Sequence, residues 1–87
     1  MYIIDIRPTL KKKLVKLALK SPMQAEIIVK KSEEIIKDPH RYKSLRHPLN
    51  NFKRVHIDKH FVLTFSIDEE TQTVILEDYD HHDKIYR

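Results

Sequence analysis

Residues 52–79 of the chain read FKRVHIDKHFVLTFSIDEETQTVILEDY. Apolar side chains alternate most regularly over 61–67, the pattern of a strand with one buried face. Polar residues interrupt the apolar pattern on both sides of this run. We expect a strand over 52–57, a turn at 58–60, a strand over 61–67, a polar loop at 68–72 and a last strand over 73–79. Strands joined by such short connections predict an antiparallel meander.

The residues before the meander favour helices. Residues 2–6 form a short β-branched run, typical of a strand, which Pro8 ends. Apolar residues then recur at helical spacing up to Lys20, and again from Pro22 to the Asp38-Pro39 stop. Ser21 and Gln24 fit a capping box for the second helix. The order β-α-α-β-β-β predicts an α+β fold, with two N-terminal helices packed on a small, mainly antiparallel sheet.

The composition limits both size and chemistry. The chain has 87 residues, which predicts a single domain over 1–87. It contains no glycine, which excludes the Walker A loop, the Rossmann fingerprint and the nucleophile elbow. It contains no cysteine, which excludes disulfides and thiolate chemistry. Its apolar runs are too short for a membrane span, so we expect a cytoplasmic protein without a membrane partner.

Charge is unevenly spread along a chain whose formal net charge is +4. Residues 37–60 carry seven Lys or Arg and only two acids, whereas residues 68–83 carry seven acids and no Lys or Arg. The basic stretch contains Lys37, Arg41, Lys43, Arg46, Lys53, Arg54 and Lys59. A charge run is either a solvated face or a surface that binds a polyanion, and charge alone leaves both open.

All six histidines follow residue 39. The spacing of His56 and His60 would suit a metal only on a helix, and a turn is expected between them. We therefore expect no metal and no cofactor. Imidazoles among cations are suited to RNA cleavage, which needs a base for the 2′-hydroxyl, an acid for the leaving oxygen and positive charge at the phosphate. A surface role for any single histidine is the alternative.

Four segments form a recognisable set: His47-Pro48-Leu49, the run Phe52–His56, the run Phe61–Phe65, and His82 with Tyr86 four residues later. Together with the order β-α-α-β-β-β, they resemble the RelE/ParE toxin superfamily, and its YafQ-like branch most closely. The resemblance implies an mRNA endoribonuclease (mRNA interferase) that acts in the ribosomal A site and inhibits translation. It also implies a cognate antitoxin of the RelB/DinJ type that forms a hetero-oligomer with the toxin.

The resemblance also implies the site residues. His47, His56 and His82 would be catalytic, with acid and base unassigned. His60, Phe61 and Tyr86 would contact the substrate, the two aromatic residues by stacking on a base. Apart from the resemblance, the basic residues among the histidines, Arg46, Lys53 and Arg54, are expected to bind phosphate.

Two positions depart from the family pattern. An acid is expected before the third-strand aromatic, where this chain has His60, so a carboxylate role is lost or has moved to Asp58. Many RelE members carry arginine where this chain has Val62, an absence shared by the YafQ-like branch. The alternative is therefore a non-catalytic binding module, either a ParE-like toxin that acts on gyrase or a degenerate toxin.

Overall fold

The computed structural model describes residues 1–85. Its elements are β1 (Ile3–Ile6), α1 (Pro8–Lys20), α2 (Pro22–Lys37), the 3₁₀ turn η1 (Pro39–Arg41), β2 (Lys53–His56), β3 (Phe61–Asp68), β4 (Thr73–His81) and α3 (His82–Ile85). No helix in this part of the chain is long and apolar enough to cross a bilayer.

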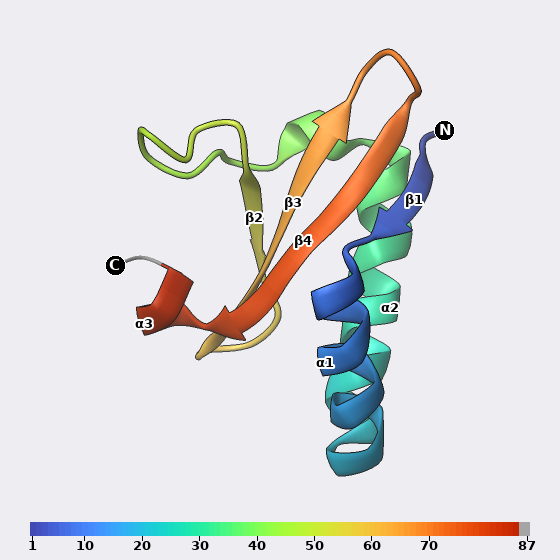
Figure 1. Cartoon of the computed structure of the whole chain (residues 1–87), viewed down its shortest axis with the longest axis vertical. Helices are drawn as coiled ribbons and strands as arrows, with labels where there is room; N and C mark the ends of the chain where they lie inside the picture. The colour runs from blue at the N-terminus through green and yellow to red at the C-terminus, as the bar shows by residue number, and fades with distance from the viewer. Residues whose placement is uncertain (86–87) are drawn as a thin grey trace.

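The strands form one sheet in the order β1-β4-β3-β2. β1 runs parallel to β4, whereas β2, β3 and β4 are an antiparallel meander. In Figure 1 the paired helices α1 and α2 lie on one side of the sheet and extend beyond its end. The predicted α+β fold, with two helices on a mainly antiparallel sheet, is confirmed.

The core lies between the helices and one face of the sheet. Leu10 of α1 and Ile28 and Ile35 of α2 are buried against the strands. Leu63 and Phe65 of β3 meet them, because alternate residues of a strand point to the same face. The core also contains Val55, Ile57, Val74, Leu76 and Tyr79. Side chains from both helices and all three meander strands therefore share one core.

β3 is buried on both faces, although the helices cover only one face of the sheet. Val62 and Thr64 point away from the helices, yet both are buried. In the sheet register Val62 lies between His56 of β2 and Asp80 of β4, so a strand flanks it on each side. The alternating sequence pattern therefore predicted less burial than this central strand has.

The capping box predicted at the start of α2 is wrong. Ser21 occupies the N-cap position but makes no side-chain capping hydrogen bond. Instead the Gln24 side-chain amide donates to Asp58 Oδ2 at 3.0 Å and to Tyr79 Oη at 2.9 Å. Gln24 is therefore used to tie α2 to the turn after β2 and to β4, which a local sequence motif could not reveal.

Three of the seven acids at 68–83 pair with Arg7 or Lys13. Arg7 Nε lies 2.8 Å from Glu77 Oε1, and Lys13 Nζ lies 2.8 Å from Asp78 Oδ1 and 3.2 Å from Asp80 Oδ2. α1 is held in this way along the β4 strand. Part of the acidic run is therefore an internal partner for α1 rather than a solvated face.

Candidate active site

Two histidines and two arginines line a cleft on the face of the sheet away from α1 and α2. The lining residues are Arg46, Arg54, His56 and His82, and the cleft has a volume of about 420 Å³. We call it the His–Arg cleft. β2 supplies two of these residues, the loop before β2 supplies Arg46, and α3 supplies His82. In Figure 1 that loop and α3 lie on the same side of β2 and β3.

The register of β2 places Arg54 and His56 in the cleft. Arg54 lies opposite Thr64 and His56 lies opposite Val62, both of which face away from the helices. Val55, between them, points to the core and is buried. The alternation of a strand thus directs one guanidinium and one imidazole to the same face.

His82 is placed against His56 by the turn between β2 and β3. Its backbone N–H donates to the His60 carbonyl oxygen at 2.6 Å. The ring centroids of His56 and His82 are 6.4 Å apart, with their planes tilted by 32°. Nδ1 of His82 also lies 3.3 Å from Asp83 Oδ1. Two imidazoles from distant parts of the sequence therefore border one space.

Hydrogen bonds also hold the arginine side of the cleft. Arg54 Nη1 donates to the Ser44 carbonyl oxygen at 3.2 Å. Arg46 begins a tight turn that is closed by the Leu49 N–H donating to its carbonyl oxygen at 2.9 Å. The buried Leu45 anchors that loop next to Arg46. His47 lies in the same exposed turn and is not among the residues, within 1–85, that line the cleft.

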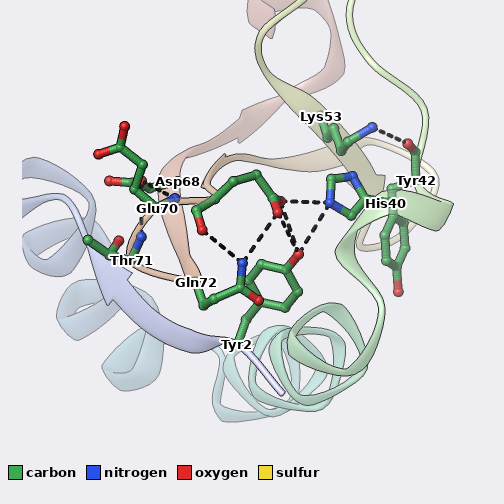
Figure 2. Close-up of polar contacts among 9 residues, drawn as sticks. Tyr2, His40, Tyr42, Lys53, Asp68, Glu70, Thr71 and Gln72 are labelled. Atoms are coloured by element: carbon green, nitrogen blue, oxygen red, sulfur yellow. Dashed lines mark hydrogen bonds and ion pairs between the residues drawn. The ribbon is translucent and has the colours of Figure 1, made fainter.

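The structure separates Lys53 from Arg54. Lys53 lies opposite Phe65 in the register, on the helix-covered face, and its Nζ donates to the Tyr42 carbonyl oxygen at 3.0 Å (Figure 2). The alternation of β2 already contained this signal, since Lys53 has the same parity as the core residue Val55.

Phe61 and His60 also lie outside the cleft lining. Phe61 stacks on Tyr79, with ring centroids 5.2 Å apart and planes 11° apart, and packs against the core. His60 stacks on His81 with a centroid separation of 5.8 Å. Tyr86, the other aromatic residue that the resemblance implies, lies outside the described residues.

The Asp58 carboxylate makes hydrogen bonds within its own turn. Its Oδ1 accepts hydrogen bonds from the His60 N–H at 2.7 Å and the Phe61 N–H at 2.9 Å. These bonds, the one from His60 first, hold the pKa of the Asp58 carboxyl below its usual range. The carboxylate is therefore ionised and already hydrogen-bonded to the backbone. It is poorly suited to replace the acid that the family pattern expects at the position of His60.

The cleft contains the groups needed to move protons beside an anion. An imidazole can accept or donate a proton near neutral pH, and a guanidinium presents fixed donors to phosphate oxygens. A neighbouring hollow, in which Arg41 and Lys43 join Arg54 and His56, extends the positive surface. No group of three histidine, aspartate or glutamate side chains within residues 1–85 is arranged to hold a metal ion.

Two relatives match nearly the whole chain. An uncharacterized protein of Methanosarcina mazei is 63% identical over 86 residues, which cover 99% of this chain and 100% of the relative. A protein of Methanocaldococcus jannaschii named "Putative toxin RelE4" is 58% identical over 87 residues, which cover 100% of this chain and 93% of the relative. No protein-family model matches the chain.

Solved structures share the fold. The toxin–antitoxin complex RelBE2 from Mycobacterium tuberculosis matches with a TM-score of 0.77 and 25% identity, over 93% of this chain and 91% of that one. YafQ from E. coli matches with a TM-score of 0.74 and 13% identity, over the whole of both chains, a likeness of fold alone. The fold and these relatives define a small α+β toxin of a toxin–antitoxin system. The chain belongs to the RelE/ParE toxin superfamily.

Proposed function

We propose that this toxin is a ribosome-dependent mRNA endoribonuclease that uses histidines, without a metal, for acid–base catalysis. The observation that supports the proposal is the His–Arg cleft, in which His56 and His82 border the same space as Arg46 and Arg54. General acid and base groups each contribute typically ~10²–10⁴ in rate, and both are present here.

The proposed reaction is an internal transesterification of RNA. One imidazole accepts the proton of the 2′-hydroxyl while that oxygen attacks the adjacent phosphorus. The bond from phosphorus to the 5′-oxygen then breaks, and the other imidazole donates a proton to the leaving oxygen. The products are a 2′,3′-cyclic phosphate and a 5′-hydroxyl, so protons and electrons balance without a further reactant. Which of His56 and His82 is the base stays open.

Arg54 and Arg46 are proposed to stabilise the negative charge that builds up on the phosphate. Guanidinium groups hold phosphate oxygens through paired N–H donors, and Arg54 is already oriented by its bond to the Ser44 carbonyl. His47 remains a proposed auxiliary group, because it lies beside Arg46 in the exposed turn and could approach bound RNA. Lys53 and Phe61 are left out of the proposed machinery because both lie on the helix side of the sheet.

The decisive experiment compares single substitutions on ribosomes that carry a defined mRNA. His56→Ala and His82→Ala should each lower the single-turnover cleavage rate by ~10²-fold or more, while ribosome binding changes only a few-fold. His40→Ala is the matched control, because His40 lies at the opposite end of β3, and it should cleave at the parental rate. Parental cleavage by both cleft variants would contradict the proposal.

The proposed partner is a cognate antitoxin of the RelB/DinJ type that binds the toxin as a hetero-oligomer. The fold match to the toxin–antitoxin complex from M. tuberculosis supports such a partner. Because its proposed substrate is mRNA on ribosomes, the protein is proposed to act in the cytoplasm. The YafQ-like branch is the proposed position within the superfamily.

A binding module without catalysis, acting on gyrase or only on an antitoxin, is the competing function. Its supporting observation is that His60 stands in place of the expected acid while Asp58 is occupied by its turn. Expression of the toxin alone distinguishes the two. New mRNA ends inside translated codons support cleavage, whereas growth arrest with unchanged mRNA ends and altered DNA supercoiling supports the gyrase function.

A further inference from the structure

A second hollow lies between α1 and α3, apart from the His–Arg cleft. Four lysines line it: Lys13, Lys16 and Lys20 of α1 and Lys84 of α3. Leu17, Phe61, Tyr79 and Asp80 also line it, and its volume is about 330 Å³. We call this hollow the lysine groove. In Figure 1, α1 and α3 lie on either side of the end of β4.

The groove keeps a positive charge after its internal ion pairs are counted. Lys13 is used by the fold, since it pairs with Asp78 and Asp80. Lys84 lies 3.9 Å from Asp80, at the outer limit of an ion pair. Within residues 1–85, Lys16 and Lys20 have no ion-pair partner.

This concentration of lysine destabilises α1 by like-charge repulsion. The helix carries five lysines and no acidic residue. Lys16 and Lys20 are four residues apart, a spacing at which like charges destabilise a helix. An anionic ligand in the groove would remove this repulsion and would release counterions of its own.

The lysine groove and the His–Arg cleft both border the short helix α3. His82 at the start of α3 lines the cleft, and Lys84, two residues later, lines the groove. A flexible chain that leaves the cleft over α3 would therefore meet the groove next. The half-buried ring of Phe61, which stacks on the buried Tyr79, adds one aromatic group to this path, which favours a chain that carries bases.

Other anionic surfaces fit the groove less well. A membrane-binding helix presents apolar side chains beside its lysines. The exposed apolar residues Val15 and Leu19 of α1 do not line the groove, whereas Lys16 and Lys20 do. Leu17 also lines the groove, but it packs against the core, so the exposed apolar residues of α1 lie outside the groove and the lysines lie inside it.

We propose that the lysine groove binds the phosphates of single-stranded RNA on one side of the cleavage point, with Lys16 and Lys20 as the principal contacts. This inference rests on the proposed function, because it extends the path of the same RNA strand. It assigns α1 a role in RNA binding in addition to its packing against β4.

The test measures binding rather than cleavage. The probe is a fluorescein-labelled RNA of about 15 nucleotides, comparable to known single-strand site sizes, with every 2′-hydroxyl methylated so that it cannot be cleaved. The Lys16→Gln/Lys20→Gln double variant should bind more weakly than the parent. The slope of log affinity against log salt should fall by about 0.7 for each lost phosphate contact. A trinucleotide that fills only the cleft should bind both proteins equally.

The matched control is the double variant Lys30→Gln/Lys31→Gln on α2. These lysines pair with Glu26 and Glu34, and the control changes the net charge by the same amount. It should retain the parental salt slope. Equal slopes for the two double variants, or a loss confined to antitoxin or anionic-vesicle binding, would overturn the proposal.

The outcomes separate this inference from the proposed function. Cleavage by the parent combined with equal slopes removes the lysine groove and leaves the endoribonuclease. A slope that depends on Lys16 and Lys20, in a protein that never cleaves ribosome-bound mRNA, removes the endoribonuclease and leaves an RNA-binding groove.

Discussion

At the scale of single residues, strand parity decides which cations reach the candidate site. Arg54 and Lys53 are neighbours with the same charge, but they face opposite sides of the sheet. Arg54 lines the cleft beside His56, while Lys53 bonds to the Tyr42 carbonyl oxygen. A one-residue shift of β2 would exchange them, because the side-chain period of a strand is two.

Tyr42 carries a buried hydroxyl without a hydrogen bond among the described residues. Its ring packs edge-on against Phe65, with centroids 5.7 Å apart, so the ring contributes to the core and the hydroxyl does not. We expect Tyr42→Phe to raise the free energy of unfolding by about 1 kcal/mol, since a buried unpaired hydroxyl is costly. Thermal unfolding should then shift upward by about 4–8 °C for a chain of this size. A lower melting temperature would show that the hydroxyl has a partner.

At the scale of elements, the turn between β2 and β3 is the support for α3. Asp58 holds the turn through the backbone N–H groups of His60 and Phe61, and Gln24 of α2 holds Asp58. The carbonyl oxygen of His60 then receives the N–H of His82. The position of His82 thus depends on a carboxylate that never enters the cleft.

Substitution at Asp58 should therefore loosen both the turn and α3. We expect Asp58→Ala to lower the free energy of unfolding by about 1–2 kcal/mol, by analogy with the loss of a helix cap. Amide hydrogen exchange at His82 should accelerate in the same variant.

Asp58→Asn is the control for this effect, because its side-chain oxygen can still accept from both backbone N–H groups. It should keep most of the stability and the slow exchange at His82. Fast exchange in Asp58→Asn would show that the two backbone bonds to Oδ1 are not enough, and that the turn needs the charge or the Gln24 bond to Oδ2, which Asn cannot accept.

At the scale of the whole molecule, a polar clasp joins three distant segments. Tyr2 Oη donates to Glu69 Oε1 at 3.0 Å, and His40 Nε2 lies 2.7 Å from the same oxygen. Gln72 also donates through its side-chain amide to the Glu69 carbonyl oxygen. Figure 2 shows Tyr2, His40 and Gln72 converging beside the β3–β4 hairpin. The clasp therefore fixes the N-terminus and the 3₁₀ turn to the end of the sheet.

The clasp gives stability a specific pH dependence. The hydrogen bond from Tyr2, and then that to His40, lower the pKa of Glu69. A group with a lowered pKa stabilises the fold above its unfolded-state pKa, and that stability is lost as pH falls through the folded-state pKa. The parent should therefore melt above Glu69→Gln at neutral pH, and the difference should vanish in acid.

Glu70→Gln is the matched control, since Glu70 is the exposed neighbour in the same hairpin. Its melting temperature should follow that of the parent across the whole pH range. A difference between the parent and Glu69→Gln that persists unchanged in strong acid would contradict the assignment of the effect to the Glu69 carboxylate.

The sequence predicted the element order and the fold class because both depend on local periodicity. The alternation at Phe61–Phe65 and the apolar spacing of α1 and α2 are visible without neighbours. The same alternation indicated that Arg54 and His56 share a face. Family resemblance added His82, which no local pattern would have joined to them.

Only the tertiary structure decided which candidate residues lie together. It brought Arg46, Arg54, His56 and His82 to one cleft, and it placed Lys53 and Phe61 on the helix side. It also gave Gln24 a partner in Asp58 instead of a capping role. The physical reason is that a hydrogen bond or a shared cleft depends on sheet order, twist and register across distant segments, whereas periodicity reports only which face of its own element a residue occupies.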